Sequence, residues 1–256
     1  MPKLGKKAPR RLMSTPAFGD FLAKATTWPA VAPRGWEYAV NPADLNILGN
    51  DTWGDCAAAG AMHLIQVETA NTGNPLYGTL QQTLDLYSAV TGFDINAGPS
   101  GNNPTDQGTD LLSMLQYWKN TGITVTDKNG KEVVHKILGW ASLDLSSIPQ
   151  IRYANDLFGG TYLGINLPQS AEDDTSNWTY QPNSPIIGGH CVDGTGQGSA
   201  GGHLISWGMN IPFQWNFLLQ YMDEAYCIVS PAWVNAQGKS PSGLDLNGLL
   251  AAMKTL

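Results

Sequence analysis

A single cysteine stands where a polar loop runs into an alanine-rich segment. The loop "GNDTWGDC" covers residues 49–56, and the pattern of residues 56–72 predicts a helix. A helix N-terminus stabilises a thiolate, which is the reactive form of cysteine, through its dipole and its unpaired N–H groups. The N–H of Cys56 can also face negative charge that develops on a carbonyl oxygen. The position therefore indicates a nucleophile that attacks carbonyl carbon; the alternative is a small buried apolar residue.

A histidine in the second half of the chain fits the same chemistry. His190 lies in "IGGHCVDG", 134 residues after Cys56. An interval of roughly 130–150 residues is typical of one group of cysteine proteases. Two glycines before His190 would let a substrate chain pass close to the backbone. We therefore expect a Cys–His pair in which the histidine removes the thiol proton, with a core histidine as the alternative.

The elements that must position this pair change in kind along the chain. Hydrophobic spacing predicts helices in the first half and strands in the second half, which is an α+β architecture with a cleft between the halves. The expected helices lie near residues 14–25, 56–72, 78–93 and 109–122, and the expected strands near 136–143, 161–168, 188–197, 201–208 and 224–233.

Several of these segments resemble the papain-like cysteine peptidases, in order, over about residues 36–233. In "NDTWGDC", Asn50 falls at the position of that family's oxyanion-hole glutamine and Cys56 at its nucleophile. "GGHCV" is similar to the family's histidine strand. "SWG" is similar to the end of its Asn-Ser-Trp-Gly motif, which implies that Trp207 shields the histidine. The resemblance is nearest to a divergent group found in phage and bacterial proteins.

The third catalytic position departs from the family pattern. Ile205 stands where the family has its asparagine, and an isoleucine side chain cannot accept a hydrogen bond from His190. Ser206 is the expected substitute, provided that the strand presents it to the histidine ring. Asp193 and Asn210 are the further candidates.

The resemblance implies a fold and three possible functions. The fold is a helical N-terminal half, whose nucleophile helix packs against a C-terminal antiparallel sheet or barrel. We expect one such domain at 14–256, with a helical part at about 50–130 and a β part at about 131–235. The implied function is a thiol hydrolase of peptide or isopeptide bonds. Ile205 and the charge of Asp55 favour an alternative, a weak or inactive papain-fold binding or structural protein such as a virion component. An acyl transferase of transglutaminase type is the third possibility.

Composition restricts the partners. The chain carries a net charge of −7, yet its first eleven residues hold five basic residues and no acidic one. We expect residues 1–13 to form a disordered basic arm, and the acidic remainder does not suit nucleic acid. The sequence shows no signal peptide, no membrane span and no disulfide framework among its three cysteines. It predicts a cytoplasmic or virion-associated protein that acts on a peptide or protein, without metal or cofactor, and it leaves the oligomeric state open.

Overall fold

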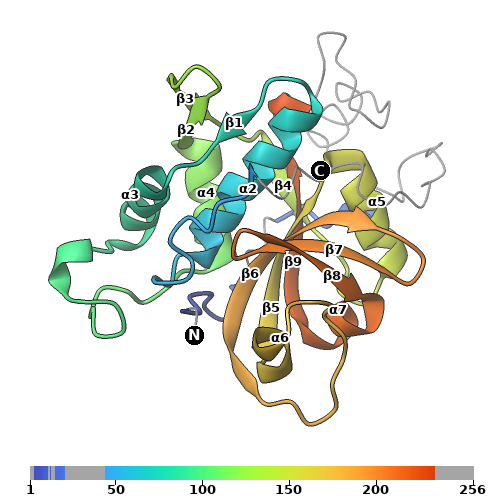
Figure 1. Ribbon diagram of the computed structural model, residues 1–256. Coiled ribbons are helices and arrows are strands. Elements are labelled where there is room, and N and C mark those ends of the chain that lie inside the picture. Colours follow the sequence, from blue (N-terminus) through green and yellow to red (C-terminus); the bar gives the residue numbers. More distant parts are fainter. Residues whose placement is uncertain (1–2, 11, 13–14, 21–43, 234–256) are drawn as a thin grey trace.

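The structure, a computed structural model, describes residues 3–10, 12, 15–20 and 44–233. Helices gather in the first half of the chain and a large sheet in the second, and the two halves pack side by side (Figure 1). The expected α+β fold class is therefore confirmed. The helix predicted near 14–25 lies mostly outside the described residues. No helix in the part of the chain that the structure describes is long and apolar enough to cross a membrane.

Helix α2 (Cys56–Asn71) is the central helix of the first half. Its residues from Cys56 to Thr69 are all buried, because small alanine side chains let neighbouring elements approach it closely from every side. It contacts β6 of the large sheet more extensively than any other element. The helix therefore joins the two halves and carries its first residue to the boundary between them.

Two capped helices pack around α2. Helix α3 (Leu80–Thr91) begins at a capping box made by Thr79 and Gln82 and ends at Gly92, whose φ of 79° closes the helix in the left-handed conformation. Helix α4 (Leu111–Asn120) begins at Asp110, whose side chain accepts a hydrogen bond from the Ser113 N–H. Asp110 therefore caps α4, and the Thr109 backbone is free to pair elsewhere.

The strands form two sheets. A small sheet, which the sequence pattern did not predict, lies in the first half in the order β1-β2-β3. The large sheet has the order β4-β9-β5-β6-β7-β8, with every pairing antiparallel, and its apolar face is covered by α5, α6 and α7. The strands predicted in the second half are confirmed within a few residues. The remaining elements are β1 (Leu76–Tyr77), η2 (Ile95–Ala97), β2 (Ile123–Asp127), β3 (Glu132–His135), β4 (Gly139–Ser142), α5 (Ile148–Phe158), β5 (Thr161–Pro168), α6 (Gln169–Asp173), β6 (Ile186–Gln197), β7 (Gly201–Ser206), β8 (Met209–Gln214), α7 (Trp215–Tyr221), β9 (Met222–Val229) and η3 (Pro231–Trp233).

The basic N-terminal segment, expected to form a disordered arm, contacts both halves over the residues that the structure describes. Residues 3–10, which we call the arm, run between the two halves, and Lys6 forms a parallel bridge with Thr109. Further along, the Ser142 N–H donates to the Pro16 carbonyl at 2.9 Å, which fixes the chain beyond the arm to β4. The physical reason is charge complementarity: the basic arm meets acidic residues that the fold gathers at the boundary between the halves.

Candidate active site

Cys56 is the first residue of α2 and lies at the boundary between the two halves. Its side chain is only 1% exposed. Burial raises the pKa of its thiol to about 11, while the nearby backbone N–H groups of Cys191 and Gly5 act in the opposite direction. Cys191 directly follows His190 on β6, so α2 brings Cys56 against the histidine strand. Cys191 and Cys227 are likewise buried and unpaired.

The carboxyl group of Asp55 disturbs the thiol less than its position suggests. Asp55 precedes Cys56 and is fully buried, and burial raises its pKa well above the usual value. A raised pKa favours the neutral acid, which exerts no full charge on the neighbouring sulfur. Burial in the folded protein thus reduces the negative charge that Asp55 would otherwise place beside Cys56.

His190 is held on one side of its ring and free on the other. It is fully buried on β6, and its Nε2 lies 2.7 Å from the Ser206 Oγ. Its Nδ1 has no hydrogen-bond partner among the described residues. Burial lowers the pKa of the ring to about 3, so the neutral form prevails. With the proton on Nε2, the ring donates to Ser206 and presents Nδ1 as a proton acceptor.

The strand register explains why Ser206 rather than Ile205 reaches the histidine. Asp193 of β6 pairs with Ile205 of β7, so these two share one face of the sheet. His190 lies three residues before Asp193 and therefore points to the other face, as does Ser206. Ser206 lies diagonally opposite His190 on the neighbouring strand, which brings its hydroxyl group to the histidine ring.

The two alternative acceptors lie elsewhere. Asp193 points toward α2, where its Oδ1 lies 3.2 Å from the place a Cβ on Gly60 would occupy. Asn210 lies on β8 and pairs with Ile205 of β7. Neither has a hydrogen bond to His190 among the described residues.

Trp207 covers the histidine ring. The two rings stack with centroids 4.7 Å apart and an interplanar angle of 24°. Trp207 and Gly208 form the two-residue turn of the β7–β8 hairpin, with φ values of 49° and 68°. Positive φ at both positions gives the twist that a tight hairpin needs, although it strains a tryptophan. This strained turn directs the indole back over His190.

Asn50 lies near the N-terminus of α2. It belongs to the turn at residues 48–52, which includes Leu48 and Gly49, and it is buried. Its proximity to Asp55 acts to lower the pKa of that carboxyl against the larger effect of burial, and neither carboxyl oxygen has a hydrogen-bond partner among the described residues. The Asn50 Oδ1 has no partner among the described residues either. Asn50 thus lies beside the helix N-terminus, close to Asp55.

The arm crosses the site directly over these residues. The Lys6 N–H donates to the Gly189 carbonyl at 3.1 Å, one residue before His190, and the Gly5 N–H faces the Cys56 sulfur. Gly5 packs against Gly54 so closely that an added Cβ would overlap the Gly54 oxygen. The arm therefore covers Cys56.

Ion pairs anchor the arm on both sides. The Lys6 Nζ lies 2.9 Å from the Asp223 Oδ1 and 3.4 Å from the Glu224 Oε1, both on β9. Lys3 pairs with the buried Asp106, which also accepts hydrogen bonds from the Gly54 N–H and the Tyr87 hydroxyl. Sequence reasoning missed these carboxylates as part of the site. The five basic residues at the start of the chain were the available signal.

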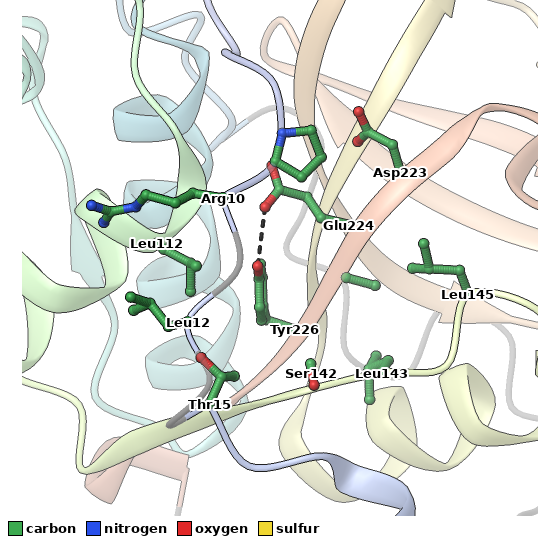
Figure 2. A pocket seen from close by; sticks show the side chains of 12 residues that line it. Arg10, Leu12, Thr15, Leu112, Ser142, Leu143, Leu145, Asp223, Glu224 and Tyr226 are labelled. Carbon is green, nitrogen blue, oxygen red and sulfur yellow. Dashed lines mark hydrogen bonds between the residues drawn. The ribbon is translucent and has the colours of Figure 1, made fainter.

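A cavity of about 390 Å³ lies between the arm and the two halves (Figure 2). Asp223 and Glu224 border it on one side, and Leu112 and Arg10 on the other. The Tyr226 hydroxyl donates to the Glu224 Oε2 at 3.1 Å, which fixes the carboxylate. Asp223 and Glu224 of β9 thus contact Lys6 and also border this cavity.

A helix that begins with a buried cysteine and packs against an antiparallel sheet that presents a histidine is the architecture of papain-like cysteine proteases, and this chain has that fold. No family model and no curated protein matches the sequence. Solved structures similar to it include xylellain, a cysteine protease from Xylella fastidiosa, with a TM-score of 0.63, 11% identity, and coverage of 90% of this chain and 96% of that one.

Two further neighbours were solved as precursors. The Amb a 11 cysteine protease, a ragweed pollen allergen, in its proform has a TM-score of 0.58 and 17% identity, covering 85% of this chain and 70% of that one. Procathepsin L 3 of the Tenebrio molitor larval midgut has a TM-score of 0.56 and 13% identity, covering 80% and 72%. At these identities the likeness establishes the fold, which confirms the papain-like expectation.

Proposed function

We propose that the protein is a thiol hydrolase of peptide or isopeptide bonds, with Cys56 as nucleophile and His190 as general base and acid. The observation that carries the proposal is the state of the His190 ring. Ser206 holds its Nε2, Trp207 covers its face, and its Nδ1 is unpartnered among the described residues, on the strand whose next N–H lies near the Cys56 sulfur. An oriented ring with one free nitrogen is what deprotonation of a thiol requires.

The reaction would proceed through an acyl-enzyme. Cys56 loses its proton to His190 Nδ1, and the sulfur attacks the carbonyl carbon of the substrate. The N–H of Cys56 and the amide of Asn50 would donate to the oxyanion. His190 then protonates the leaving amine, and water, deprotonated by the same ring, releases the acid. Ser206 is a positioning residue, because it acts through the histidine.

With the arm in the cleft, substrate could bind only after the arm had left. The arm lies between the two halves and places an N–H over the sulfur, so the covered form is latent. Likeness to two structures solved as precursors is consistent with latency. We place the chain among phage or bacterial papain-like proteins on the sequence resemblance.

A papain-fold protein without turnover is the second candidate. The buried thiol, with a pKa of about 11, and the buried ring, with a pKa of about 3, form a neutral pair rather than an ion pair. Displacement of the arm would admit water and reduce both shifts, whereas an inactive protein would keep them.

Labelling and turnover together test the proposal. Iodoacetamide should label Cys56 faster than Cys191 and Cys227, and His190→Ala should slow that labelling. A mixture of synthetic peptides incubated with the full chain should be cleaved, and Cys56→Ser should abolish the cleavage. Equal labelling of all three cysteines with no cleavage, even when the arm is weakened by substitution, would favour the inactive protein.

A further inference from the structure

The side chain of Lys6 fills a pocket in the large sheet beside the catalytic residues. Its side chain is 1% exposed, although lysine is among the residues least often buried. The ammonium contacts Asp223 and Glu224 and also donates to the Lys7 carbonyl at 3.1 Å. A buried cation with this many oxygen partners is bound by a built site rather than resting on a surface.

The pocket exists because one strand lacks a side chain at the right place. Gly164 of β5 lies opposite Glu224 of β9, and a Cβ on Gly164 would overlap the Lys6 Cε. Any other residue at this position would close the space that the lysine stem uses. The pocket therefore combines a glycine wall with two carboxylates at its end.

The carboxylates are pre-organised for a cation. The side chain of Glu224 is only 4% exposed, and the Tyr226 hydroxyl fixes its second oxygen. Burial raises the pKa of Glu224 to about 7, while the charge of Lys6 acts in the opposite direction. Asp223 and Glu224 also border the 390 Å³ cavity (Figure 2).

The residue that fills the pocket directly follows the arm residue that faces Cys56. Gly5 faces the Cys56 sulfur, and the next residue, Lys6, donates its N–H to Gly189 beside His190. A peptide that replaced the arm would present its own side chain to the same pocket within two residues of the bond over Cys56.

We propose that the pocket now filled by Lys6 is a substrate subsite, and that the enzyme selects peptides with a lysine or arginine within two residues of the cleaved bond. This inference rests on the proposed hydrolase function. Once the arm leaves, Asp223 and Glu224 remain side by side on β9 without a cation. A basic side chain restores the pair, whereas a neutral one leaves the carboxylates unpaired, and such a loss discriminates strongly between substrates.

Cleavage-site profiling tests the selectivity. The full chain and its Lys6→Met variant, whose arm is weakened, are incubated with a peptide mixture that holds every residue at every position, and mass spectrometry reads the cut sites. Among the cut sites, lysine or arginine should be at least ten times as frequent as leucine at one fixed position relative to the cleaved bond. In the double variant Asp223→Asn with Glu224→Gln, the ratio of cuts at basic residues to cuts at leucine should fall toward one. Asp173→Asn, which changes an exposed carboxylate of α6, is the matched control. Cleavage without a basic preference, or a preference unchanged in the double variant, would overturn the inference.

A second measurement decides the inference without catalysis. In Lys6→Ala, propylammonium has the length of the removed part of the side chain. At about ten times its Kd it should raise the melting temperature of that variant by roughly 3 °C, while 1-propanol should not. The rise should vanish when Asp223→Asn and Glu224→Gln are added. Propylammonium stabilisation without cleavage would reject the proposed function and keep the cation site, and absence of the stabilisation would reject the cation site itself.

Discussion

Replacing Lys6 by methionine should open the cleft. Methionine keeps most of the apolar stem and removes the ammonium that contacts Asp223 and Glu224. Breaking a buried ion pair by removing one partner costs about 3–5 kcal/mol. Two features reduce this figure. The side chain of Asp223 is 18% exposed and keeps some hydration, and Glu224, whose pKa is about 7, takes up a proton readily once unpaired.

We therefore expect the covered state to lose roughly 2–3 kcal/mol relative to the open state, which corresponds to about a 30- to 150-fold rise in the open fraction. Iodoacetamide should label Cys56 faster by the same factor at pH 7.5, as long as the open state is rare in the unaltered chain. Peptide mass spectrometry assigns the label to each cysteine. Cys191 and Cys227 are buried in the sheet, so labelling of these two would report unfolding instead.

Lys7→Met is the matched control for this experiment. Lys7 is exposed, and its backbone N–H, which donates to the Thr109 carbonyl at 2.9 Å, survives the substitution. It removes one positive charge from the same arm without touching the pocket. Equal acceleration in both variants would mean that general charge holds the arm. If Lys6→Met produced no acceleration, the Lys6 ion pairs would not be what keeps the arm over Cys56.

Three further predictions concern the site and the core. Ser206→Ala should slow alkylation of Cys56 about fivefold at pH 7.5, since one hydrogen bond of about 1 kcal/mol no longer orients the ring, and an unchanged pH–rate profile would remove Ser206 from the site. Trp207→Ala should destabilise the protein by about 3–5 kcal/mol and move the pKa of His190 from about 3 toward its usual value as water enters, which urea denaturation and NMR titration measure. Glu68 is buried, and its pKa is raised to about 8. Its neutral form therefore contributes stability that is fully present below about pH 4.5 and is lost as the pH rises to 8, so the melting temperature should fall over this range. Glu68→Gln should abolish this fall, and an undiminished fall in the variant would mean that another group causes it.

Local patterns were sufficient to predict much of the site. The loop-to-helix junction at Cys56 and the glycine-flanked strand at His190 each carry their signal within a few residues. Trp207 followed from a three-residue motif. Ser206 required one more step, because the choice between it and Ile205 depends on which face of β7 meets His190, and the pairing of Asp193 with Ile205 decides that.

The arm and its pocket could not be predicted, for a physical reason. Lys6 and Asp223 are 217 residues apart, and net charge gives no indication of which carboxylates the fold gathers around a cation. A basic segment with few apolar residues has no core of its own and is therefore predicted to be disordered. Gly164 did not predict the pocket either, since a glycine in a strand indicates that another group approaches closely but does not identify that group. Only the tertiary arrangement supplies the partner.

The arm belongs to the same chain as the cleft that it covers, so its binding to the cleft is intramolecular. Diluting the protein leaves the covered fraction unchanged, whereas a separate peptide of the same sequence would dissociate. A short tether acts like a ligand at roughly millimolar concentration. The contact between Pro16 and Ser142, which fixes the chain beyond the arm, shortens that tether further. Cutting the chain between Arg10 and Thr15 would thus convert a tethered arm into a separate, weakly bound peptide that dissociates on dilution, without altering any contact in the cleft.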